Sequence, residues 1–150
     1  MFRGQFSHTI DAKGRVSVPA RFRDLIAASD SGHVVLAPSP SDPCLHLYPL
    51  GAWQELEEKI ADLPRFDSSV LRFRRMYVSA AVECDMDRSG RVLVTPSHRE
   101  RAQLEREVLW AGMGRHVELW SRALWEEVNR ALSPTEHEAF MARVEELIRI

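Results

Sequence analysis

One short pattern occurs twice in this chain of 150 residues. Residues 11–19 read DAKGRVSVP and residues 87–96 read DRSGRVLVTP, so that the same Asp, Gly, Arg and Val recur 76 positions apart. A turn and the strand after it, repeated at a fixed spacing, are typical of a duplicated structural unit. The duplication therefore limits the possible folds before composition is considered.

The similarity between the two copies continues beyond the turn. Each motif is followed by an arginine-bearing helical segment, two apolar strands and a helix that begins near a tryptophan, Trp53 or Trp125. This order predicts two repeats of about 60 residues each. The expected boundaries are a first repeat over 1–64, a helical connector over 65–80, a second repeat over 81–132 and a C-terminal helix over 133–150.

The residues that the two copies of the motif share predict a tight turn. Asp11 and Asp87 can accept hydrogen bonds from backbone amides two residues on, and Gly14 and Gly90 allow the positive φ that such turns need. Alternating apolar residues before and after the first turn indicate strands. We therefore expect a β-hairpin with a basic tip in each repeat.

Helical periodicity predicts which side chains face the core. The segment after Pro19 places Phe22, Leu25 and Ile26 on an inward face. A longer helix over 52–63 carries one apolar stripe, and the C-terminal segment begins with a proline at its first helical position. The stripe consists of Trp53, Leu56, Ile60 and Leu63, and the amphipathic face of the C-terminal helix consists of Phe140, Val144, Leu147 and Ile148. The C-terminal face could pack on its own subunit or on a neighbouring one.

Charge is distributed unevenly along the chain. The formal net charge is only −2, but residues 1–23 carry five basic residues against one acid, while acids gather in 54–59 and 144–150. Arginine accounts for most of the basic residues, and its planar guanidinium suits phosphates and guanine edges. The candidate DNA-contacting residues are Arg3, Lys13, Arg15, Arg88 and Arg91. The alternative for Arg15 and Arg91 is a simple ion pair back to the aspartate of the same turn.

Motifs for catalysis or metal binding are not found in the sequence. The six histidines are scattered, and neither Cys44 nor Cys84 has a Cys or His companion at the spacing of common metal sites. Nucleophile-elbow, phosphate-loop and dinucleotide-binding patterns are also missing. We therefore expect no enzyme, no metal, no cofactor and no small-molecule substrate. No apolar run reaches the length of a membrane span, which favours a cytosolic protein without membrane association.

Four motifs together closely resemble the MraZ family. They are the opening M-F-x-G, the stretch DAKGRVSVPARFR, the second D-x-x-G-R-V, and ELWS-x-x-x-W at 118–125. The resemblance implies an α+β fold of the AbrB-like superfamily, in which two swapped hairpins form one small β-barrel flanked by helices. It also implies a homo-oligomeric ring, an octamer or larger. Such a ring would be a nucleoid-associated transcriptional regulator that binds double-stranded DNA at direct repeats in the promoter of the division and cell wall gene cluster.

The resemblance also selects particular residues. Carried over by position, the family motif falls on Asp11 and Arg15 in the first copy and on Asp87 and Arg91 in the second. Lys13 and Arg3 are expected beside the first arginine, and Gly14 and Gly90 are expected to be structural.

The second copy departs from the family pattern. Its proline stands at Pro96, one place later than Pro19 in the first copy, with Thr95 in the equivalent position. This departure predicts a shifted strand end and helix start there, so we expect Arg15 to matter more for base reading than Arg91. The competing function is an oligomeric protein-interaction module without specific DNA readout, supported by the Glu-rich faces at 54–59 and 136–146.

Overall fold

The structure is a computed structural model that describes residues 1–30 and 32–148. Position 31 of the expected first repeat and positions 149 and 150 of the expected C-terminal helix lie outside the described residues. The described part contains eight strands and six helices. In chain order these are β1 (Gln5–Thr9), β2 (Arg15–Ser17), α1 (Ala20–Asp30), β3 (His33–Pro38), β4 (Leu45–Pro49), α2 (Leu50–Ala61), α3 (Ser68–Met76), β5 (Val82–Asp85), β6 (Arg91–Leu93), α4 (Pro96–Arg101), β7 (Glu107–Gly112), β8 (Val117–Ser121), α5 (Arg122–Val128) and α6 (Pro134–Ile148).

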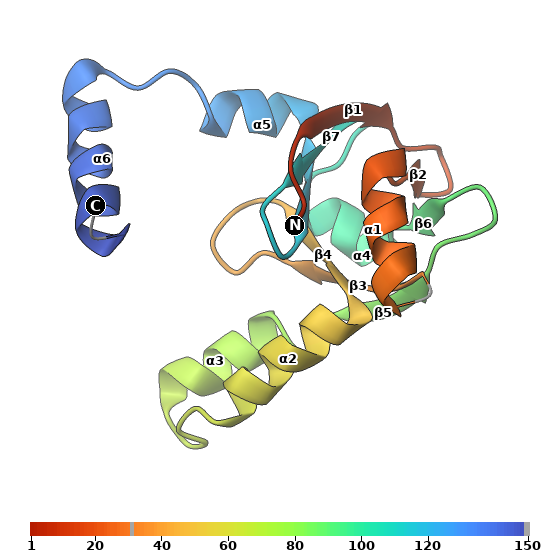
Figure 1. The fold of residues 1–150 in the computed structure, drawn as a ribbon, viewed down its shortest axis with the longest axis horizontal. Coiled ribbons are helices and arrows are strands. Elements are labelled where there is room, and N and C mark those ends of the chain that lie inside the picture. Colours follow the sequence, from red (N-terminus) through yellow and green to blue (C-terminus); the bar gives the residue numbers. More distant parts are fainter. Residues whose placement is uncertain (31, 149–150) are drawn as a thin grey trace.

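The two repeats interlock through their strands (Figure 1). The larger sheet has the order β1-β7-β8-β4-β3-β5, with antiparallel pairing throughout. The first strand of each repeat therefore pairs with the other repeat: β1 with β7, and β5 with β3. The equivalent strands of the two repeats are β1 and β5, β3 and β7, and β4 and β8. If each strand is replaced by its equivalent, the same order is obtained, read from the other end of the sheet. The sheet therefore has approximate two-fold symmetry.

A second, two-stranded sheet is formed by β2 and β6, one strand from each repeat. Val16 pairs with Val92, its own equivalent in the other copy, and both side chains are fully buried. A bridge between Ile10 and Val16 connects this short ladder to the end of β1. The α+β class and the two repeats are thus confirmed. Pairing between the outer strands β1 and β5 is not seen among the described residues, and the closed barrel stays a prediction.

The main core lies between the two sheets and α1. It takes side chains from both repeats, including the largest fully buried ones, Trp110 and Phe22. The indole of Trp110 donates a hydrogen bond to the carbonyl oxygen of Ser17 at 2.9 Å, which ties β7 to β2. Because neither repeat supplies this core alone, each is expected to depend on the other for stability.

A second apolar cluster lies on the outer face of the sheet, where α2 and α3 pack against β3 and β4 (Figure 1). Trp53 and Ile60 of α2 are buried there with Tyr77, which follows α3. Two expected core residues are not buried: Leu25 on α1 is 39% exposed, and Leu63, beyond the end of α2, is 42% exposed. Among the described side chains of α1, only Phe22 and Ile26 are buried.

The expected shift in the second repeat is wrong. α1 begins at Ala20 and α4 begins at Pro96, which are 76 positions apart, the same spacing as Arg15 and Arg91. Thr95 replaces Pro19 as the residue before the helix, and its hydroxyl accepts a hydrogen bond from the amide of His98. A threonine cap followed by proline at the first helical position starts a helix in the same place.

The C-terminal helix α6 lies apart from the rest of the chain (Figure 1). None of its described residues is buried, and Phe140, Leu147 and Ile148 are 42%, 63% and 58% exposed. The possibility that its apolar face packs on its own subunit is therefore not supported. Within the described residues, every helix is too short or too polar to span a membrane.

Candidate nucleic-acid interface

The turn between β1 and β2, residues 11–15, is held by one aspartate. The carboxylate of Asp11 accepts hydrogen bonds from the backbone amides of Lys13 at 3.0 Å and Arg15 at 2.9 Å. The other carboxylate oxygen of Asp11 accepts a hydrogen bond from Nε of Arg15 at 2.7 Å, and Gly14 has a φ of +88°. We call residues 11–15 the first tip turn.

The second tip turn, residues 87–91, repeats this geometry. Asp87 accepts hydrogen bonds from the amides of Ser89 and Arg91, both at 2.9 Å, and from Nε of Arg91 at 2.9 Å. Gly90 has a φ of +75°. The predicted turn function of Asp and Gly is confirmed in both copies, and so is the ion pair that had been the alternative explanation for the arginines.

The hydrogen bonds at each tip turn keep its aspartate charged. The hydrogen bond from the backbone amide of Arg15 is the main cause that holds the pKa of Asp11 below its ordinary value. Desolvation opposes it, and the Arg15 side chain and the amide of Lys13 lower the pKa further. The same contacts from Arg91 lower the pKa of Asp87. Each pair uses Nε of the arginine, so the two terminal nitrogens of the guanidinium point beyond the aspartate and are the part that can reach a phosphate or a base edge.

The β2–β6 ladder places the two arginines on one face. In its register Arg15 lies opposite Leu93, and Ser17 lies opposite Arg91. Directly opposed residues point to the same side of a sheet, so these four side chains share the surface opposite the buried Val16–Val92 pair. Arg15 and Arg91 are then diagonal neighbours, about 7–8 Å apart. We call Arg15, Ser17, Arg91 and Leu93 the ladder face.

Each tip turn packs against the other repeat. The carbonyl oxygen of Gly14 accepts a hydrogen bond from the amide of Val94 at 2.8 Å, and that of Gly90 accepts one from Val18 at 2.9 Å. These cross-repeat bonds fix the position of both turns relative to the ladder.

Two further arginines, which were not predicted from the sequence, also lie at the tip turns. Arg99 of α4 lies so close to Gly14 that a Cβ at that position would come within 3.0 Å of its Nε, and Arg23 of α1 donates a hydrogen bond to the carbonyl oxygen of Ser89 at 3.3 Å. Arg23 and Arg99 are 76 positions apart, so the spacing of the repeat could have identified them. Each tip turn therefore carries cations from both copies.

The other predicted site residues divide into two groups. Lys13 and Arg88 are exposed within the tip turns. Arg3 is exposed but precedes β1, next to the Gly112–Gly114 turn, whereas the first tip turn follows β1. Five residues of extended strand, about 16 Å, separate them. The expectation that Arg3 lies beside Arg15 is wrong, and its contact with DNA stays a prediction.

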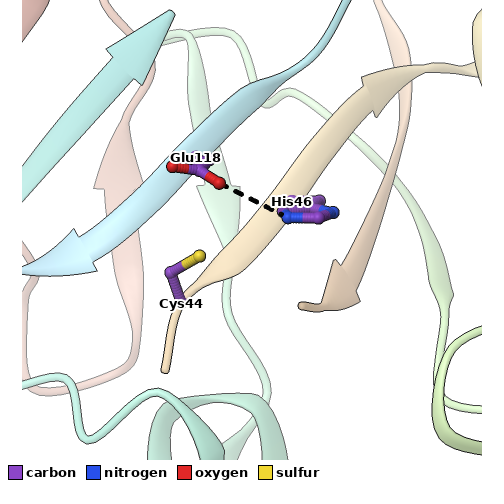
Figure 2. Close-up of side chains that lie close together, drawn as sticks. All are labelled: Cys44, His46 and Glu118. Atoms are coloured by element: carbon purple, nitrogen blue, oxygen red, sulfur yellow. Dashed lines mark ion pairs between the residues drawn. The ribbon is translucent and has the colours of Figure 1, made fainter. Parts of the chain in front are cut away.

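A cluster of possible metal ligands lies elsewhere, on the outer face of the sheet at its two central strands, β4 and β8 (Figure 2). The ligand atoms of Cys44, His46 and Glu118 all lie within 4.8 Å of one another. The expectation that Cys44 lacks a histidine companion is wrong, because two positions along an extended strand bring side chains to the same face. Glu118 then lies directly opposite His46 in the pairing of β4 with β8.

Both tip turns thus present a compact and rigid set of cations on one side of the molecule, at the opposite end from α6 (Figure 1). Hydrogen bonds hold the aspartates, the glycines and the guanidinium Nε atoms in place before any ligand arrives. Preorganised arginines of this kind suit the recognition of phosphates and of guanine edges.

Comparison with known proteins gives a consistent assignment. A family model described as "MraZ protein, putative antitoxin-like" matches the chain twice, over residues 1–76 and 77–147. A protein of Desulfitobacterium hafniense (strain Y51) named "Transcriptional regulator MraZ" is 39% identical over 150 residues, which cover 100% of this chain and 99% of the relative. Proteins of the same name from Caldanaerobacter subterraneus subsp. tengcongensis and Carboxydothermus hydrogenoformans are 40% and 42% identical, over 87% and 83% of this chain and 88% and 84% of their own lengths. The chain therefore belongs to the MraZ family.

Proposed function

We propose that this protein is a transcriptional regulator that binds double-stranded DNA through the ladder face and the two tip turns. The observation that carries the proposal is the placement of Arg15 and Arg91 on one exposed face, each fixed by its own aspartate. The names of the relatives, which call them transcriptional regulators, support the same conclusion.

The ladder face can contribute both affinity and base reading. Phosphate contacts from Lys13, Arg88 and the two arginines of the ladder would give affinity that depends on salt. The terminal guanidinium nitrogens suit the O6 and N7 acceptors of guanine, and Leu93, which is 54% exposed, suits a thymine methyl group. The sequence favoured Arg15 over Arg91 because of an expected shift in the second repeat. The two helices start at equivalent positions, so we assign base contacts to both arginines.

A single subunit offers few cations, so assembly is part of the proposal. We infer that the exposed apolar face of α6 packs on a neighbouring subunit and helps to build a homo-oligomeric ring. A ring that presents several ladder faces to direct repeats would gain affinity through effective concentration. The family resemblance supports the ring, the closed barrel, the nucleoid location and the promoter of the division and cell wall gene cluster as the target. The division of the chain at 1–64, 65–80, 81–132 and 133–150 is proposed on the same basis.

The test is a binding measurement on the DNA upstream of the protein's own gene. Fluorescence anisotropy would compare the intact protein with Arg15→Ala, Arg91→Ala and the double variant at several salt concentrations. Arg72→Ala on α3 is the matched control, because Arg72 is exposed and lies away from the ladder. Circular dichroism would show that every variant is folded.

We expect each single variant to weaken binding and to reduce the salt slope by about 1 per subunit contact, and the double variant to lose specific binding. Arg72→Ala should behave as the intact protein does. Equal binding by the double variant and the control at matched salt would refute the proposed interface. A nuclease-resistant complex with another protein, combined with no preference for the upstream DNA, would favour the protein-interaction module instead.

A further inference from the structure

We propose that Cys44, His46 and Glu118 form a zinc-binding site that joins the first repeat to the second. The three side chains come from β4, the residue before it, and β8, and Figure 2 shows them converging on the same region. They offer a cysteine sulfur that loses its proton when the ion binds, an imidazole and a carboxylate, which together suit Zn²⁺. The site lies away from the ladder face and does not depend on the proposed DNA contacts.

Strand geometry explains why these residues meet. Leu45 and Leu47 point into the main core, as do Val117 and Leu119 of β8. The residues that alternate with them, Cys44, His46 and Glu118, must therefore lie on the opposite face of the sheet. His46 and Glu118 are direct partners across the β4–β8 pairing.

The distances are close to those of a bound ion. Nε2 of His46 lies 3.5 Å from Oε2 of Glu118. Two ligands at ordinary Zn–N and Zn–O bond lengths in a tetrahedral site would be about 3.4 Å apart. The largest separation among the three ligand atoms is within 4.8 Å, so a contraction of about 1 Å completes the arrangement. A water molecule would occupy the fourth position.

Hydrogen bonds orient two of the three ligands. Nδ1 of His46 lies 2.7 Å from the hydroxyl of Tyr77, which itself donates to Tyr48 at 3.3 Å. When Nδ1 carries the proton and donates to Tyr77, Nε2 keeps its lone pair for the metal. The indole of Trp120 donates to Oε1 of Glu118 at 3.0 Å, which leaves Oε2 directed toward His46. Such outer contacts are typical of metal-ligating histidines and carboxylates.

Burial and an unsatisfied atom also indicate a ligand in this region. Cys44 is 1% exposed and the side chain of Glu118 is 11% exposed, so both groups are shielded from water. The neighbouring His116 has its ring centre 4.5 Å from that of His46, and its Nε2 is buried with no hydrogen-bond partner in the described part of the chain. A water molecule bound to the ion would give Nε2 of His116 the partner that the described residues do not provide.

The experiment uses the full-length protein, stripped of metal with a chelator under reducing conditions. Titration with Co²⁺ should produce intense visible bands of tetrahedral cobalt and a near-ultraviolet thiolate-to-cobalt band that saturate at one ion per chain. Addition of Zn²⁺ should remove both. Zn²⁺ at a free concentration of about 100 times its Kd should raise the folding equilibrium constant about 100-fold.

Matched variants assign the ligands. Cys44→Ser should lose the thiolate band, whereas Cys84→Ser, which removes the other cysteine, should retain it. His46→Asn and Glu118→Gln should weaken Co²⁺ binding by more than roughly 100-fold, and Tyr77→Phe by about 10-fold, because Tyr77 acts only through His46.

X-ray absorption on the intact zinc-loaded protein provides a measurement that does not depend on any variant. One sulfur ligand at about 2.3 Å from zinc is expected. A spectrum without sulfur, a thiolate band that is lost in Cys84→Ser rather than Cys44→Ser, or a stoichiometry well below one ion per chain would overturn the proposal. Those results would leave the three residues as a hydrogen-bonded network without metal.

Discussion

Replacement of Gly14 by alanine tests how the two repeats hold the tip turns. Gly14 has a φ of +88°, and an added Cβ would lie 2.5 Å from the backbone carbonyl oxygen of Val94. Gly32 provides a matched control, because its φ is +87° but the nearest atom to an added Cβ is 3.8 Å away. Both variants strain the backbone, and only Gly14→Ala also pushes the first tip turn away from the second repeat.

The expected sizes follow from these contacts. A non-glycine residue in the left-handed region costs roughly 1–2 kcal/mol, which applies to both variants. The clash at Gly14 adds about 1–3 kcal/mol, because the atom that the new Cβ would meet is a backbone oxygen, which cannot rotate away. Moving it would also disturb the hydrogen bond of 2.8 Å that the amide of Val94 donates to the carbonyl oxygen of Gly14. Gly14→Ala should therefore lose about 2–5 kcal/mol of unfolding free energy. At roughly 2–4 °C per kcal/mol, the contribution of the clash places the thermal unfolding midpoint of Gly14→Ala about 2–12 °C below that of Gly32→Ala.

Thermal unfolding followed by tryptophan fluorescence, at one fixed protein concentration, would measure the difference. Gly90→Ala should fall between the two, because its Cβ would meet the flexible side chain of Arg23 rather than backbone. If Gly32→Ala destabilises the protein as much as Gly14→Ala, the contact between the first tip turn and Val94 does not have the stabilising effect derived from its geometry.

Three further outcomes are expected. A carboxyl NMR titration should place the pKa of Asp11 below its ordinary value of 3.8. The contribution of Asp11 to the unfolding free energy is then complete above its unfolded-state pKa and is lost as the pH falls through its folded-state pKa. Asp11→Asn should remove this part of the pH dependence of stability. Leu93→Thr should change the unfolding free energy by no more than about 0.5 kcal/mol yet weaken DNA binding, and an unchanged affinity would show that Leu93 touches no base. Deletion of 133–150 should lower the number of subunits in the assembly, measured by sedimentation, without altering the near-ultraviolet circular dichroism of the buried tryptophans. A changed spectrum would mean that α6 packs on its own subunit.

Local features of the fold could be predicted from the sequence. The tip turns follow from Asp and Gly at fixed positions, and the strands and helices follow from periodicities of two and 3.6 residues. Trp53 and Ile60 are buried as predicted, because their spacing keeps them on one side of α2. Leu25 is exposed because the core contacts of α1 end at Phe22 and Ile26, and only the packed structure shows where that contact stops.

Non-local features could not be derived from the periodicity of the chain. Periodicity identifies β1 and β7 as strands but does not determine that they pair, and the exchange between repeats entered only through the family resemblance. The cluster of Cys44, His46 and Glu118 was missed because common metal motifs were sought along the sequence rather than across paired strands. The duplication contained the missing signal, since His46 and Glu118 occupy equivalent positions in the two repeats and become partners at the centre of the symmetric sheet.

The self-pairing of Val16 with Val92 has a consequence for direction along DNA. A dimer of two identical repeats would present the same surface after a half-turn and would read both directions alike. In this chain the symmetric frame carries unlike substituents: Ser17 stands where the other copy has Leu93, and Lys13 stands where it has Ser89. Under the proposed function, a subunit can therefore distinguish the two directions along DNA and bind a sequence in one orientation. Sites repeated head to tail require this property.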